Sequence, residues 1–130
     1  MDTKLWCILI DHQHIMGEPF SVYISPETDV ADLKEKILLK MPSLLQHVDA
    51  PSLTVWKCPG LIIPGDSKGI HELKARIHRL DLSKEEDAQR LAVVRRVSSL
   101  GVAPDEVLLV QMPGTYSHST LLYLNDLPLP

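Results

Sequence analysis

The spacing of apolar residues along the chain separates central strands from peripheral ones. Residues 4–10 and 106–112 each hold an almost unbroken apolar run, which is typical of strands that are covered on both faces of a sheet. Residues 20–25 carry Phe, Val and Ile at every second position, which predicts a half-buried, peripheral strand. Residues 52–57 are rich in β-branched and aromatic side chains, so they are predicted to form a further strand.

One helix is predicted between the second and third of these strands. Apolar residues recur at helical spacing after Asp29, which is suited to an N-cap, with Thr28 as the alternative cap. Pro42 ends the helix, because the residue before a proline avoids helical geometry. Residues 11–18, between the first two strands, are mostly polar and are predicted to form a hairpin loop.

A largely helical insert is predicted between the third and last strands, at about residues 61–100. Residues 61–63 are flanked by Pro and Gly, so they form either a very short strand or a buried loop. A helix is predicted at residues 67–80, and another begins at Ser83, which forms a capping box with Glu86. The apolar face of this last helix would consist of Ala88, Leu91, Val94 and Val97.

This order of elements predicts an α+β fold of the ubiquitin-like β-grasp type. Its mixed four-stranded sheet would be packed by one helix, with the first and last strands parallel and adjacent in the middle. Because these two strands are apolar on both faces, the second face of the sheet needs a cover. The insert helices are expected to provide it, with a partner or a further domain as the alternative. The domain would span residues 1–114, and residues 115–130 would be a tail or the start of a linker.

Composition narrows the functional classes. The chain has 130 residues and a formal net charge of -4, which disfavours general affinity for nucleic-acid phosphates. The basic residues of the insert alternate with acidic ones, as is typical of a solvated, salt-bridged surface. No apolar run approaches the roughly 18–20 residues that span a bilayer. The short apolar run at residues 5–10 is followed by charge, so a conventional export signal is not expected.

Histidines and cysteines are the candidates for chemistry. His12 and His14 could supply two zinc ligands, but no second cluster lies nearby in the sequence, so solvated loop histidines are the better interpretation. His71 and His78 lie two turns apart on one predicted helix and are interpreted as surface residues in the same way. We therefore expect no metal site and no cofactor.

Cys7 and Cys58 fall in or beside apolar strands, where a thiolate is disfavoured, and both are expected to be reduced. No glycine-rich phosphate loop or nucleophile elbow is present. The chain is therefore predicted not to be an enzyme. A metal-dependent or cysteine-dependent enzyme is the less favoured alternative.

Four segments, taken in order, resemble the N-terminal domain of the Crinkler effectors of oomycetes and fungi. They are Leu5-Trp6-Cys7, Val30-x-Asp32-Leu33-Lys34, Leu53-Thr54-Val55-Trp56-Lys57 and Glu106-Val107-Leu108-Leu109-Val110-Gln111-Met112-Pro113. The third segment lies where that family carries a Leu-Phe-Leu-Ala-Lys motif. Leu53 and Lys57 match the motif, and the three residues between them differ in a way that resembles the fungal variants. The resemblance covers about residues 4–114 and is weak through the insert.

The resemblance implies a non-enzymatic, secreted N-terminal domain that serves protein interaction or trafficking into host cells. Its partner would be a host protein or another copy, and a longer protein could carry an effector domain downstream. The residues implied in binding are Leu53, Thr54, Val55, Trp56 and Lys57. Alternation places Leu53 and Val55 against the helix, which leaves recognition to the other three. The alternative interpretation is a ubiquitin-like protein-binding module that stays in the cytoplasm or nucleus.

Overall fold

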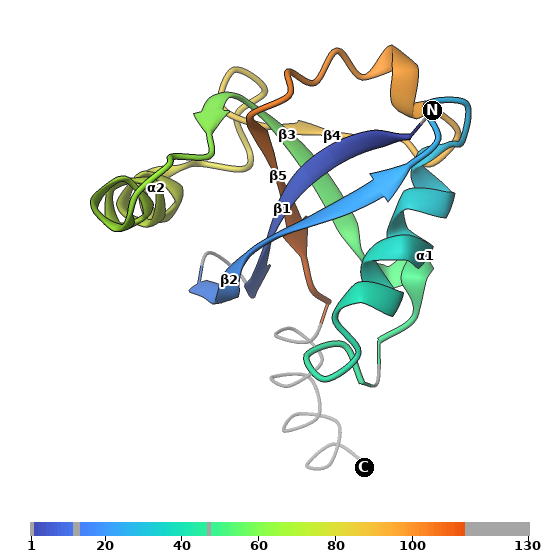
Figure 1. Cartoon of the computed structure of the whole chain (residues 1–130), viewed down its shortest axis with the longest axis horizontal. Coiled ribbons are helices and arrows are strands. Elements are labelled where there is room, and N and C mark those ends of the chain that lie inside the picture. The colour runs from blue at the N-terminus through green and yellow to red at the C-terminus, as the bar shows by residue number, and fades with distance from the viewer. Residues whose placement is uncertain (1, 12–13, 47, 114–130) are drawn as a thin grey trace, which may run out of the picture.

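The structure is a computed structural model that describes residues 2–11, 14–46 and 48–113. Over these residues it contains five strands, two α-helices and two short 3-10 helices (Figure 1). In chain order they are β1 (Thr3–Asp11), β2 (His14–Ile24), α1 (Val30–Lys40), η1 (Ala50–Ser52), β3 (Thr54–Ile62), α2 (Ser67–Arg79), β4 (Gln89–Arg90), η2 (Val97–Ser99) and β5 (Glu106–Gln111).

The strands form one mixed sheet in the order β2-β1-β5-β3-β4. The first and last strands, β1 and β5, are adjacent and parallel, and β5 lies in the middle of the sheet. The other neighbours are antiparallel. The α+β prediction with its β-grasp arrangement is therefore confirmed. The predicted number of four strands is wrong by one, because the short strand β4 pairs with β3.

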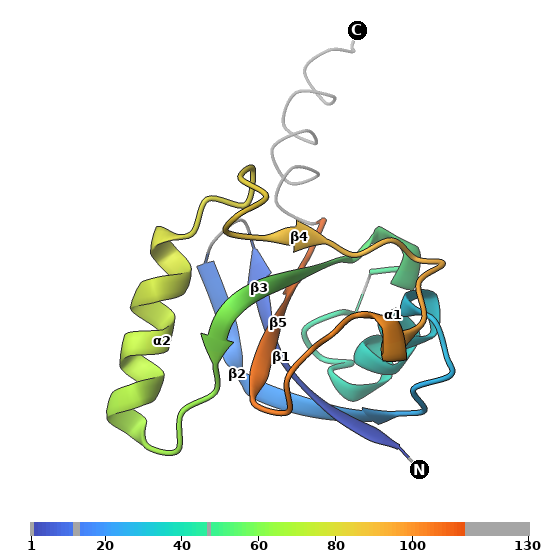
Figure 2. The same cartoon turned by 90° about the horizontal axis from the view of Figure 1, so that it is seen from above.

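Each face of the sheet has its own apolar core. On one face, Leu5, Cys7 and Leu9 of β1 pack with α1. On the other, Ile8 and Ile10 of the same strand lie in a second cluster, to which α2 contributes Leu73 and Ile77. Helices α1 and α2 accordingly lie on opposite sides of the strands (Figure 2). The expectation that a helix of the insert covers the second face is confirmed for α2.

Helix α1 forms where local signals place it. The backbone N–H of Asp32 donates a hydrogen bond to Asp29 Oδ1 at 3.0 Å, which satisfies one of the free amides of the first turn. Val30, Leu33 and Ile37 carry the buried face. The helix ends at Lys40, two residues before Pro42.

The predicted hairpin loop at residues 11–18 is mostly strand. Strand β2 already begins at His14, which pairs with Asp11, and the pairing continues through Met16. A register shift then separates this part of β2 from the part that begins at Phe20. Gly17 lies in the shifted region with a φ of 77°, a left-handed conformation that glycine adopts without a steric penalty.

The predicted helix from Ser83 is wrong. Ser83 instead donates hydrogen bonds to Asp81 Oδ1 from its backbone N–H at 3.0 Å and from its hydroxyl at 2.5 Å, and the chain continues through turns to β4. The physical reason is that the apolar residues of this segment serve different cores. Ala88 packs in the α2 cluster, whereas Leu91 packs in the α1 cluster. A single helical face cannot reach both sides of a sheet.

The rest of the insert, residues 91–100, closes the end of α1. The backbone N–H of Val30 donates to the Arg95 carbonyl at 2.9 Å, and the N–H of Val97 donates to the Thr28 carbonyl at 2.8 Å. Val97 and Leu100 add buried side chains to the α1 cluster. The insert therefore covers both faces of the sheet, with α2 on one side and residues 91–100 on the other.

Strand β3 is displaced along the chain relative to the predicted strand at residues 52–57, because it begins at Thr54, after η1, and continues to Ile62. Residues 61–63, predicted to be a short strand or a buried loop, begin as the end of β3, which runs from Thr54 to Ile62. Its register with β5 shifts between Lys57 and Ile62. Gly60 has a φ of 80° within this shift, so the strand bends there without ending. The predicted tail at residues 115–130 lies outside the described residues.

Candidate functional site

The strand that carries the family-like motif is an interior strand of the sheet. Residues 54–57 of β3 pair with β5, and Trp56 and Lys57 also pair with Arg90 and Gln89 of β4. The Val55 carbonyl accepts a further hydrogen bond from the backbone N–H of Leu91 at 2.9 Å. The backbone of the motif is therefore engaged on both sides and does not offer a free edge for pairing.

The side chains of the motif divide between the two cores. Leu53 and Val55 are 1% and 0% exposed and lie in the α1 cluster, as the alternation predicts. Trp56 packs on the opposite face, against the α2 cluster, and is half-buried. Its indole Nε1 donates a hydrogen bond to Gln111 Oε1 at 3.0 Å. The prediction of which face of the sheet Leu53, Val55 and Trp56 lie on is therefore confirmed. The motif exposes to solvent mainly Thr54 and the outer part of the Trp56 side chain.

The motif lysine is directed to a buried carboxylate. Lys57 Nζ lies 3.8 Å from Glu106 Oε2, and the two side chains are only 18% and 8% exposed. Glu106 Oε1 accepts from the backbone N–H of Ala103 at 3.2 Å, whereas Oε2 has no hydrogen bond. Lys57 is therefore the cation that compensates the charge on this buried oxygen.

A second lysine of the family-like segments is also turned inward. Lys34 of α1 is 5% exposed. Burial lowers the pKa of its ammonium group, and the positive charge of Arg90 on β4 lowers it further. Both lysines of these segments thus sit where the insert meets the sheet and the helix, rather than on an open surface.

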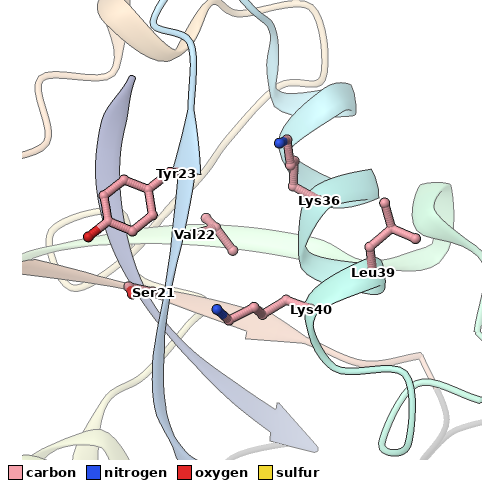
Figure 3. Close-up of a pocket in the computed structure, with 6 residues that line it drawn as sticks. All are labelled: Ser21, Val22, Tyr23, Lys36, Leu39 and Lys40. Atoms are coloured by element: carbon pink, nitrogen blue, oxygen red, sulfur yellow. The ribbon is translucent and has the colours of Figure 1, made fainter. Parts of the chain in front are cut away.

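An open groove lies elsewhere, between β2 and α1 (Figure 3). Its volume is about 350 Å³, and it is lined by Ser21, Val22, Tyr23, Lys36, Leu39 and Lys40. Figure 3 shows Lys40 extending from α1 toward the strand, whereas the side chain of Lys36 runs along the helix. Leu39 on α1 is 78% exposed, so a large apolar side chain at the groove is in contact with water; Tyr23 is 55% exposed, and its ring lies on the side of β2 away from α1 (Figure 3).

The sequence reasoning missed this groove, although part of its signal was present. Alternation identified residues 20–25 as a peripheral strand, which implies a free edge. The exposure of Leu39 agrees with the sequence pattern, because the helical spacing that Leu38 shares with the other apolar residues of the helix does not include Leu39.

The cysteine thiols lie inside the two cores. Burial raises the pKa of Cys7 from an ordinary value of 9.0 to about 12. Burial also raises the pKa of Cys58 to about 12, and the carboxylate of Glu106 adds to the shift. Both are free cysteines, with Cys7 in the α1 cluster and Cys58 in the α2 cluster. A neutral, enclosed thiol is a poor nucleophile and a poor metal ligand.

The histidines that the structure describes, His14, His71 and His78, lie on two elements. His12 lies outside the described residues. His14 of β2 meets His78 of α2 with ring centroids 6.1 Å apart and nearly perpendicular planes, while His71 is exposed on α2. Among the residues that the structure describes, no group of three or more His, Cys, Asp or Glu side chains is placed to hold a metal ion. None of the described helices is long and apolar enough to cross a membrane.

A comparison with family models matches residues 3–107 to the Crinkler effector protein N-terminal domain. The chain belongs to this Crinkler family. The match runs from β1 through the insert to the first residues of β5, so α2 and β4 lie inside the family region. The comparison with curated proteins gave no match. The resemblance that the four sequence segments suggested is therefore confirmed at the level of the family.

Proposed function

We propose that this Crinkler domain is a non-enzymatic delivery domain that binds a protein partner while its effector enters host cells. The observation that carries the proposal is the family match over residues 3–107, in a family defined by effector proteins. The open groove between β2 and α1 supports a binding role, since it combines a strand at the sheet edge with exposed apolar side chains.

The absence of enzyme activity is supported by the state of the candidate nucleophiles. Cys7 and Cys58 are 0% and 1% exposed, and the raised pKa of each thiol keeps it neutral near pH 7. Stoichiometric zinc in the purified protein would contradict this part of the proposal. Zinc that is lost in a His14→Ala variant would assign the metal to the pair formed with His78.

We propose in addition that the protein is secreted and that its domain is a fungal-type variant of the family. The middle of the motif, Thr54-Val55-Trp56, supports a fungal variant because it departs from the Leu-Phe-Leu-Ala-Lys pattern. We propose that Thr54 and the exposed part of Trp56 add contacts to a partner, while Leu53, Val55 and Lys57 hold the strand in place. The alternative function is a protein-binding module of the same fold that stays inside the producing cell.

A split fluorescent protein tests delivery directly. The full chain is fused to the small fragment and produced in a pathogen that secretes Crinkler effectors, while host cells produce the large fragment. Fluorescence in host cells above that of a fusion without the chain is the expected result. Fluorescence equal to this control would overturn the delivery role, and partner binding without delivery would favour the intracellular alternative.

A further inference from the structure

We propose that the groove between β2 and α1 binds an extended, acidic segment of a partner protein, which adds to the sheet as a strand beside β2. This partner class rests on the protein-binding function proposed above. The bound segment would hydrogen-bond to the β2 backbone, place apolar side chains in the groove and direct carboxylates to Lys36 and Lys40.

The first observation is the outer edge of β2, which is not paired with any other described strand. The sheet order ends at this strand, so half of its backbone N–H and C=O groups face away from β1. The strand has two regions, which differ in how well they are protected against pairing with another chain. In the first, Pro19 and the register shift around Gly17 disrupt regular pairing. Residues 20–24 form the second region, where the pairing with β1 is regular and there is neither a proline nor a register shift. The groove lies beside this second region.

The second observation is the apolar surface along this region. Val22 lies at the base of the groove, and Figure 3 shows its side chain pointing toward α1. Leu39 is exposed on α1 and lines the groove, whereas the exposed ring of Tyr23 lies on the other side of the strand (Figure 3). In an added strand, every second side chain points to the same face, so alternate apolar side chains of the partner would lie between β2 and α1. The regular part of β2 offers room for a segment of about five residues.

The third observation is charge. Lys36 and Lys40 lie one turn apart on α1, and both line the groove. Within the described part of the chain, neither lysine forms an ion pair. Asp32 lies one turn before Lys36, so the positive end of the groove is the end near Lys40. Two unpaired lysines on a protein of net charge -4 favour a carboxylate-bearing peptide at this place.

The opposite edge of the sheet does not offer the same opportunity. Strand β4 has only two residues, Gln89 and Arg90, and it shields the motif strand β3. A short edge strand is a usual protection against pairing with another chain. Among the described strands, β2 is therefore the edge at which strand addition is expected.

Random peptides displayed on phage provide the probe. They are selected in parallel on the full chain and on its Lys36→Glu/Lys40→Glu variant, and circular dichroism verifies that the variant is folded. We expect the wild-type chain to enrich peptides with a β-branched apolar core and flanking Asp or Glu. A synthetic copy of an enriched peptide should bind the charge-reversed variant at least tenfold more weakly. It should also bind the wild-type chain more weakly as salt rises.

The matched control reverses two exposed lysines outside the groove, in the variant Lys68→Glu/Lys84→Glu. This variant has the same net charge as the first, so an equal loss of binding in both would mean that the peptide responds only to overall charge and would overturn the assignment. In the wild-type chain, the backbone amides of residues 20–24 should show the largest NMR shifts on peptide binding. No enrichment, peptides without acidic residues, or shifts centred elsewhere would also overturn it.

The two proposals fail in different ways. Delivery that is unchanged in the Lys36→Glu/Lys40→Glu variant, together with a failed peptide selection, would remove the groove as the binding site and leave the delivery function standing. Loss of delivery in the wild-type fusion would remove the delivery function. The peptide selection and the NMR shifts would still decide whether the groove binds acidic strands.

Discussion

The motif lysine provides the sharpest test of how this domain is held together. We expect Lys57→Met to destabilise the protein, because it leaves the Glu106 carboxylate buried without its cation. Methionine keeps the apolar stem of the side chain, so the change in free energy of unfolding reports mainly on the charge.

The size of the effect follows from distance and burial. Two unit charges 3.8 Å apart attract each other by about 4 kcal/mol at an effective dielectric constant of about 20. The cost of removing both side chains from water offsets much of this attraction. The separation also exceeds that of a hydrogen bond, and Lys57 keeps some contact with water. We therefore expect a loss of about 1–3 kcal/mol, which is the usual cost of a buried acceptor left without a partner.

The pair between Lys74 and Glu18 is a matched control within the same chain. Its atoms are closer, at 3.3 Å, but its side chains are 31% and 74% exposed. Surface pairs contribute about 0–1 kcal/mol, so Lys74→Met should cost less than Lys57→Met despite the shorter distance. Burial rather than separation would then determine the difference.

A double-mutant cycle completes the test. Glu106→Gln removes the charge but keeps the oxygen that accepts from Ala103, so combining it with Lys57→Met should recover part of the loss. Urea unfolding followed by circular dichroism measures all four proteins, with unchanged m-values required. Equal and small effects of Lys57→Met and Lys74→Met would refute the structural role and leave the motif lysine free for recognition.

Three further predictions concern the core, the helix cap and the thiols. Leu53→Ala should lower the free energy of unfolding by about 2–5 kcal/mol in urea unfolding, because Leu53 is 1% exposed, whereas Leu39→Ala should change it by less than about 0.5 kcal/mol. Asp29→Ala should lower the free energy of unfolding by about 1 kcal/mol in the same assay, because it removes the carboxylate that accepts a hydrogen bond from the backbone N–H of Asp32. An unchanged free energy of unfolding would mean that the cap does not contribute to stability. A thiol whose pKa is higher in the folded protein than in the unfolded chain stabilises the folded state at any pH below the unfolded-state pKa. This stabilisation is lost as the pH rises toward and through the folded-state pKa. The pKa of about 12 for Cys7 and for Cys58 therefore predicts falling stability from about pH 9 to pH 12, and a Cys7→Ala/Cys58→Ala variant should show a weaker decline in thermal unfolding.

The sequence by itself determined the central strands and the first helix. Residues 4–10 and 106–112 were predicted as central because apolar side chains on both faces of a strand require cover on both sides, wherever the cover comes from. The cap at Asp29 was also predictable, because the side chain and the amide that it accepts from are three residues apart. Such signals are local, so they need no knowledge of the distant chain. The motif strand was found in the same way, including the inward facing of Leu53 and Val55.

Only the tertiary structure decided what the insert does. Its capping-box signal at Ser83 was overridden because Ala88 and Leu91 are needed in cores on opposite faces of the sheet, and a gain in burial there outweighs a weak local preference for helix. The pairing of Lys57 with Glu106 joins residues far apart in the sequence, so no spacing rule could reveal it. The groove beside β2 likewise depends on which face of α1 turns toward the strand. These features arise from contacts between distant segments, which is why the pattern of the chain alone did not contain them.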